Sequence, residues 1–151
     1  MNMIKDFEII EDYTADIAFI AYGRNLEELF INSARAITSI QVDLGCVEPK
    51  ECIEVNIESY DLLGLLRKWL EELVYWRDVK QIFFSKVADI VVNLKISAEG
   101  VEEYKVSAKL CGERFDSRKH GGFVEVKAVS YHNMEIGKKD NMWYARVLVD
   151  I

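Results

Sequence analysis

The stretch KHGGFVEVKAVSYH, residues Lys119–His132, is the segment around which the chain is organised. It starts with a Gly-Gly turn and continues with the alternation of apolar and polar residues that is typical of a strand. One face is expected to carry Val124, Val126, Ala128, Ser130 and His132, and the other Glu125, Lys127, Val129 and Tyr131. Because both histidines of the protein fall in this segment, it is the first candidate for function. The alternative is a half-buried strand whose histidines have no function.

Working outward, apolar periodicity predicts two amphipathic helices among about seven strands. The helices are expected at 25–40 and 59–79, with Asn25 and Ser59 as N-caps. The strands, eight when 82–84 and 88–96 are counted separately, are expected at 7–10, 17–22, 51–58, 82–84, 88–96, 104–115, 124–136 and 142–149. This pattern indicates one domain, residues 1–151, of the α+β class. Within this class, we expect a two-layer sandwich with two helices packed on one face of a mostly antiparallel sheet.

The charge of the chain limits its partners. It has 26 acidic and 19 basic residues, a net charge of −7. Direct nucleic-acid binding is disfavoured because phosphate contacts need clustered Lys and Arg. A divalent cation, or a partner attracted to carboxylates, fits better. The local basic group Arg114, Arg118 and Lys119 leaves direct RNA binding or a chaperone-like role as a weaker alternative.

The cysteines and the N-terminus indicate a cytoplasmic protein. Cys46, Cys52 and Cys111 are odd in number and form no Cys-x-x-Cys pair, so all three are expected to be reduced. A zinc site is disfavoured for the same reason. The first residues contain no apolar signal region, and no apolar run approaches the ~20 residues that span a bilayer. We therefore expect no membrane association.

Four motifs in a fixed order resemble the signatures of the archease family. They are DYTAD at 12–16, WLEELVY at 69–75, the segment from Lys119 to His132, and VDI at 149–151. Together they span nearly the whole chain. The sequence departs from the family pattern at Tyr13, where archeases usually have a histidine, so a role that needs an imidazole there is in question.

Asp16 and Asp150 are the candidate metal ligands. Each lies at the end of an apolar strand, and Ile151 would add the C-terminal carboxylate beside Asp150. Hard cations such as Ca²⁺ or Mg²⁺ prefer such oxygen ligands. The resemblance implies the same, because the family's metal ligands include the aspartates that match these two positions. Asp43, in the turn after the first helix, could be a third carboxylate or only part of a turn that ends the helix.

Four further residues are candidates for contact with a partner. They are Lys119, His120, Lys127 and His132, whose side chains could bind a phosphate or a carboxylate. The alternatives are solvated loop residues, a surface ion pair for Lys127 and a strand histidine for His132. No nucleophile elbow, phosphate loop, dinucleotide fingerprint or zinc-protease motif is present.

The resemblance implies a non-enzymatic accessory protein. Archeases activate the RtcB-type RNA-splicing ligase, which joins RNA 3′-phosphate or 2′,3′-cyclic-phosphate ends to 5′-hydroxyl ends in tRNA splicing, using GTP and Mn²⁺. They promote guanylylation of the ligase histidine and multiple turnover, so RNA is contacted only indirectly. The alternative is a small metal-dependent hydrolase that binds an ion at Asp16 and Asp150 and uses His120 or His132 as general base.

Overall fold

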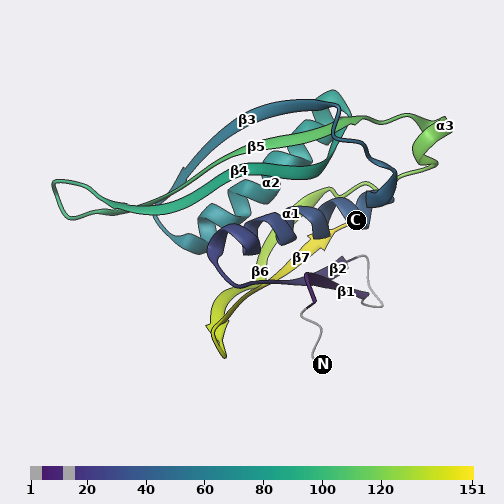
Figure 1. Ribbon diagram of the computed structural model, residues 1–151. Helices are drawn as coiled ribbons and strands as arrows, with labels where there is room; N and C mark the ends of the chain where they lie inside the picture. Colours follow the sequence, from purple (N-terminus) through teal and green to yellow (C-terminus); the bar gives the residue numbers. More distant parts are fainter. Residues whose placement is uncertain (1–4, 12–15) are drawn as a thin grey trace.

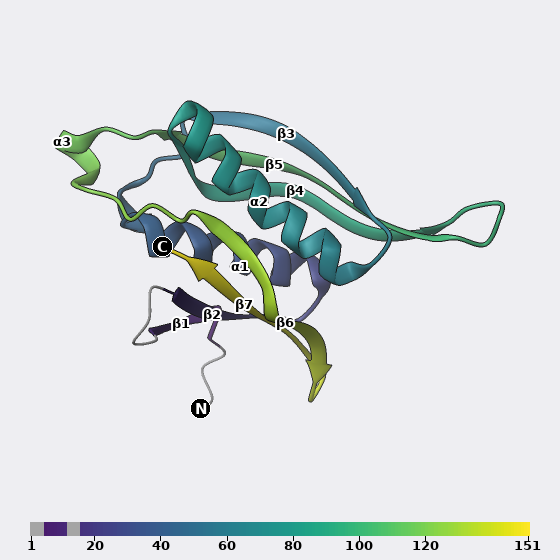
Figure 2. The same ribbon diagram turned by 180° about the vertical axis from the view of Figure 1, so that it is seen from behind.

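The structure, a computed structural model, describes residues 5–11 and 16–151 (Figures 1 and 2). Its strands are β1 Phe7–Glu11, β2 Asp16–Gly23, β3 Glu51–Ser59, β4 Ile82–Ile96, β5 Glu102–Arg114, β6 Ala128–Lys139 and β7 Met142–Asp150. Its helices are α1 Leu26–Gln41, α2 Leu62–Lys80, the short α3 Ser117–His120 and a 3₁₀ turn, η1, Leu44–Cys46.

The described strands form two antiparallel sheets. One has the order β1-β2-β7-β6 and the other the order β3-β5-β4. The α+β class and the antiparallel pairing are therefore confirmed. The predicted single sheet is replaced by two, and α1 and α2 each pack against strands of both sheets rather than covering one face of one sheet (Figure 1).

The two long helices begin where short polar side chains can cap them. The Asn25 side chain accepts a hydrogen bond from the Glu28 amide at 2.8 Å, as predicted for the start of α1. The start of α2 was predicted incorrectly. Asp61 is its N-cap, accepting from the Gly64 amide at 2.8 Å, and Ser59 is the last residue of β3.

The core lies between the helices and the two sheets, and Trp69 of α2 is one of its largest side chains. Trp69 is fully buried, and its indole nitrogen donates to the Phe30 carbonyl of α1 at 2.9 Å. This bond satisfies the polar atom of a large apolar group and connects the two helices. Strands from both sheets complete the core with residues such as Phe19, Val106, Leu110 and Val147, and Val126 joins them from the segment before β6.

β4 is one irregular strand and not the two strands that were predicted. Its pairing with β5 shifts register between Phe84 and Lys86 and again between Ala88 and Val91. Bulges of this kind bend a strand without ending it. At the first shift the backbones approach so closely that a Cβ on Gly112 would lie 1.8 Å from the Phe83 carbonyl oxygen.

The segment from Lys119 to His132 is less regular than its alternating sequence predicts. Residues 121–127 form no regular structure, and β6 begins only at Ala128. Val126 and Val129 are both buried, so the predicted two-face alternation is wrong. The register shift between Ser130 and Glu135 interrupts the strand again. The final hairpin turns at residues 140–141, because β6 continues through Lys139.

A disulfide joins two of the three cysteines, which corrects the prediction of three reduced thiols. Cys52 of β3 and Cys111 of β5 are directly paired across the ladder, with Cα atoms 4.1 Å apart, whereas Cys46 is free. This distance is slightly below the usual range for a disulfide, which is about 4.4–6.8 Å. In addition, no helix in the described part of the chain is long and apolar enough to cross a membrane.

Candidate functional site

Asp16 and Asp150 lie directly opposite each other. Asp16 is the first residue of β2, Asp150 is the last of β7, and the two are Cα partners in the antiparallel ladder. Directly opposed residues project to the same face with Cβ atoms about 4.5–5.5 Å apart, and two like charges in this position repel. Both residues are half-buried. The predicted meeting of the two strand ends is therefore present, and a bound cation would relieve the repulsion.

Lys127 lies at the same end of the sheet. Its backbone amide donates to the Asp150 carbonyl at 2.8 Å, and its side chain is exposed. Ala128 of β6, the next residue in the chain, pairs with Asp150 on the side of β7 that faces away from β2. Three of the chain's predicted functional residues, Asp16, Asp150 and Lys127, thus come together at one sheet end.

The segment 121–127 that carries Lys127 is held by backbone groups and by a buried arginine. The Val124 amide donates to the Gln41 carbonyl at 2.7 Å, at the end of α1. Arg77 of α2, only 5% exposed, donates from Nη2 to the Val126 carbonyl at 2.7 Å. The position of Lys127 therefore depends on the ends of both long helices.

Arg77 was missed from the sequence, although a signal exists. It follows Leu73 by four residues and so falls on the apolar face of α2, where an arginine is unusual. A charged residue on a buried helical face needs polar partners, and the Val126 carbonyl supplies one here.

Lys119 and His120 lie in a separate polar cluster around Glu113. Lys119 Nζ is 2.8 Å from Glu113 Oε1 and 2.7 Å from Glu48 Oε1. His120, whose side chain is fully buried, accepts at Nδ1 from the Asp116 amide at 2.9 Å. Because Nδ1 is an acceptor, Nε2 carries the proton and donates to Glu113 Oε1 at 2.8 Å. Neither side chain is directed to the Asp16–Asp150 pair.

Electrostatics favour the charged forms of Glu113 and Lys119. Burial acts to raise the pKa of Glu113, but hydrogen bonds from Lys119, the Glu48 amide and His120 outweigh it and lower the pKa to about 2. Hydrogen bonds to Glu113 and Glu48 likewise raise the pKa of Lys119. The cluster therefore fastens β5 to α3 and to the Glu48 loop through ion pairs.

Asp43 serves as a turn residue. Its carboxylate caps η1 by accepting from the Gly45 amide at 3.1 Å, and it also accepts from the Cys46 thiol at 3.3 Å. The second bond raises the pKa of that thiol. These contacts favour the interpretation of Asp43 as part of the turn after α1 over that of a third metal ligand.

His132 is exposed within the irregular part of β6. Its amide bonds the Ser130 hydroxyl at 3.0 Å. It lies four residues beyond Ala128, the neighbour of Asp150, which corresponds to about 13 Å along a strand. A general base must lie about 3 Å from the proton that it removes, so the strand geometry does not join His132 to the aspartate pair.

No group of three or more His, Cys, Asp or Glu side chains is gathered as a metal site within residues 5–11 and 16–151. Asp12 and Tyr13, which belong to the first motif, lie outside the described residues. The described residues thus supply two opposed carboxylates, which fit an oxygen-preferring cation, and Ile151 stays a predicted further ligand.

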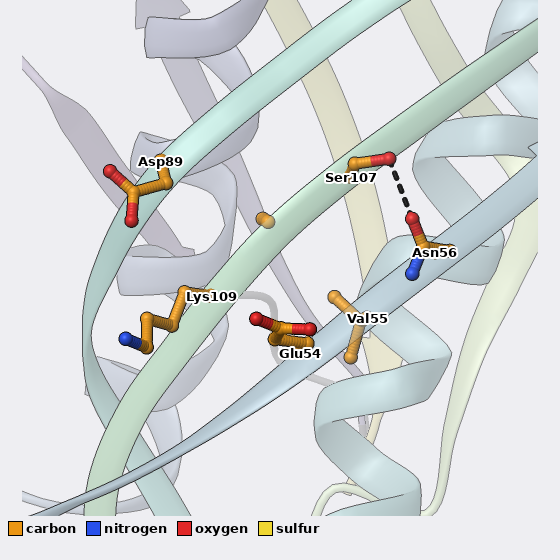
Figure 3. Close-up of a pocket in the computed structure, with 7 residues that line it drawn as sticks. Glu54, Val55, Asn56, Asp89, Ser107 and Lys109 are labelled. Atoms are coloured by element: carbon orange, nitrogen blue, oxygen red, sulfur yellow. Dashed lines mark hydrogen bonds between the residues drawn. The ribbon is translucent and has the colours of Figure 1, made fainter.

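The outer face of the β3-β5-β4 sheet has a polar groove of about 160 Å³, shown in Figure 3. Glu54, Lys109 and Asp89 rise from three neighbouring strands around it. The Ser107 hydroxyl donates to the Asn56 side chain at 2.7 Å and is therefore not paired with a base. None of the predicted site residues lines this groove, and its groups form no nucleophile–base pair.

The fold and the strand-end carboxylates define a small α+β domain with a candidate cation site between its β2 and β7 strand ends. The profile of the Archease protein family matches residues 7–151. The chain belongs to the archease family.

Relatives and solved structures support this assignment. The chain is 40% identical to the archease of Sulfurisphaera tokodaii over 98% of this chain and 100% of the relative. It is also 40% identical to the archease of Thermococcus gammatolerans over 93% and 95% of the two chains. The solution structure of Methanobacterium thermoautotrophicum protein 1598 covers 98% of this chain and 100% of its own, with 35% identity and a TM-score of 0.77. A Thermotoga maritima archease, described as a possible chaperone, shares the fold at 20% identity, with a TM-score of 0.57 and coverage of 100% and 99%.

Proposed function

We propose that this protein is a cytoplasmic, non-enzymatic activator of an RtcB-type RNA-splicing ligase in tRNA splicing. It would promote guanylylation of the ligase histidine and multiple turnover, and contact RNA only through the ligase. Membership in the archease family supports this role. The single structural observation that carries it is the direct opposition of Asp16 and Asp150 at one sheet end.

In this proposal Asp16 and Asp150 hold a divalent cation of the Ca²⁺ or Mg²⁺ class. The ion supplies positive charge to two directly opposed carboxylates. The backbone bond from Lys127 to Asp150 holds the Lys127 backbone next to this site, and the Lys127 side chain is exposed. A site with a fixed cation and a lysine suits contact with the phosphates or carboxylates of a nucleotide-using partner.

The hydrolase alternative has less support in the described residues. It needs a histidine base at the Asp16–Asp150 pair. His120 is committed to Glu113 and the Asp116 amide, and His132 is displaced along β6.

The decisive experiment is an RNA ligation assay with the ligase, with and without this protein. Asp16→Asn and Asp150→Asn keep the side-chain shape and remove one charge, so each should reduce both divalent-cation binding and stimulation by tenfold or more. Asp89→Asn, on the outer face of the other sheet, is the matched control and should behave as the unmodified protein.

Three outcomes would contradict the proposal. They are full stimulation by both strand-end variants, no stimulation by the unmodified protein, or hydrolysis of phosphoesters by this protein alone. Circular dichroism should show an unchanged fold, since substitutions at such strand ends usually alter stability by less than ~0.5 kcal/mol.

A further inference from the structure

The β4–β5 hairpin projects beyond the helices, as both views of the ribbon show (Figures 1 and 2). Pairing of the two strands continues in register to Ile96 and Glu102 near the tip. An isolated two-stranded hairpin buries little apolar surface of its own. Side chains on a projecting hairpin are therefore expected to be polar on both faces unless another surface covers one of them.

One face of this hairpin is apolar and continues the core. Val92 and Val106 are paired, buried and part of the core. The next pair on the same face is Leu94 with Tyr104, and the one after that joins Ile96 to Glu102. Leu94 is 48% exposed and Ile96 is 66% exposed. We call Leu94, Ile96 and Tyr104 the apolar tip face.

The tip is held in a fixed shape. The Ser97 amide donates to the Val101 carbonyl at 2.9 Å, the Val101 amide to the Ser97 hydroxyl at 3.1 Å, and the Gly100 amide to the Ser97 carbonyl at 2.9 Å. Gly100 has a φ of 79°, which glycine adopts without strain. A preformed surface loses little conformational entropy on binding.

The charges around the apolar tip face are acidic. On the opposite face Lys95 lies across from Glu103, so positive and negative charges are matched there. On the apolar side Glu102 faces Ile96, and Glu99 lies in the adjoining turn. A complementary surface would offer apolar side chains bordered by Lys or Arg.

We propose that the apolar tip face is a docking surface for a basic-edged, apolar patch on the partner protein, separate from the Asp16–Asp150 site. On the proposed function, on which this inference rests, that partner is the ligase. A second copy of this chain fits poorly, because each copy has a net charge of −7 and would bring the same acidic border against itself. RNA fits poorly because Glu99 and Glu102 repel phosphates. The hairpin thus contributes affinity, and the strand-end site contributes activation.

The test is a titration of this protein into the ligation assay. The double variant Leu94→Ser/Ile96→Ser should raise the concentration needed for half-maximal stimulation about tenfold, equivalent to about 1.4 kcal/mol, and leave the plateau unchanged. Val91→Ser is the matched control, since Val91 is 51% exposed on the same strand but lies on the opposite face. It should titrate as the unmodified protein. Glu102→Lys, which reverses one charge of the acidic border and leaves Leu94 and Ile96 unchanged, should also raise the half-maximal concentration.

The outcomes separate this inference from the proposed function. No stimulation by the unmodified protein rejects the function itself. The docking surface alone is overturned if the half-maximal concentration is the same for the double variant, for Glu102→Lys and for the unmodified protein. A dimer that the double variant abolishes would assign the surface to a second copy and overturn it too. Asp150→Asn should lose the plateau and still compete with the unmodified protein for the ligase.

Discussion

At the scale of single residues, Glu113 shows how a buried charge is stabilised. It is 7% exposed, and its carboxylate is contacted by the Lys119 ammonium, the His120 ring and the Glu48 amide. Removing the charged carboxylate from such a cluster leaves buried hydrogen-bond donors unsatisfied. The resulting loss of stability is larger than the stability that an exposed ion pair contributes. The cluster therefore has a structural role. The sequence does not reveal this role, because it shows only a glutamate near the end of an apolar strand.

Glu113→Gln should destabilise the protein by about 1–3 kcal/mol at pH 7 and reduce its sensitivity to acid. The folded-state pKa of about 2 lies below the ordinary value of 4.5, so the folded protein binds fewer protons at this site than the unfolded chain. The associated stability is fully present above about pH 4.5 and is lost as the pH falls toward 2. Urea unfolding at pH 7, 4.5 and 3 measures this slope.

The control is Glu51→Gln, which removes an exposed carboxylate from the start of β3. It should retain the acid slope of the unmodified protein. An equal slope in Glu113→Gln would show that the cluster does not depress the pKa of Glu113.

At the scale of elements, the disulfide fixes the register between β3 and β5. Cys52 and Cys111 are separated by 59 residues in sequence and lie opposite each other in the ladder. The chain that they enclose contains α2, β4 and the projecting hairpin. A cross-link across such a loop restricts the unfolded chain more than it alters the folded one.

Reduction of this disulfide should lower the free energy of unfolding by about 2–4 kcal/mol. Denaturant unfolding with and without a phosphine reductant measures the difference. Cys52→Ser should reproduce the loss, and Cys46→Ser, the matched control at the free thiol, should not. Alkylation of the unreduced, unfolded protein should modify Cys46 alone, so modification of all three cysteines would refute the cross-link.

At the scale of the whole molecule, the proposed cation site joins strands from the two ends of the sequence. β2 and β7 are central in their sheet, and their pairing from Asp16↔Asp150 to Gly23↔Trp143 spans the whole of β2. A ligand that binds only the folded arrangement stabilises the entire domain by mass action.

Ca²⁺ or Mg²⁺ at about 100 times its dissociation constant should stabilise the folded protein by about 2.7 kcal/mol. For a domain of this size the midpoint of thermal unfolding should rise by roughly 5–11 °C. Scanning calorimetry with chelator and with added metal measures this shift. Asp150→Asn should abolish it and Asp89→Asn should retain it; an equal shift in Asp150→Asn would place the bound ion elsewhere.

The sequence by itself determined the type of nearly every element. Helix and strand periodicity and the Asn25 cap are local properties of the chain, so the two long helices and the α+β class could be predicted. Asp16 and Asp150 could also be selected, because Asp16 comes directly before one apolar run, Asp150 comes directly after another, and both match positions in the archease motifs.

Only the tertiary structure decided which strands pair and in what register. Pairing is non-local, and bulges such as those in β4 shift which residues face each other. The division into two sheets and the Cys52–Cys111 cross-link depend on that register, and so does the opposition of Asp16 and Asp150. Lys119 and His120 are next to the predicted strand in sequence, yet α3 turns them toward Glu113. Local sequence thus specified the elements, whereas contacts between distant residues specified the site.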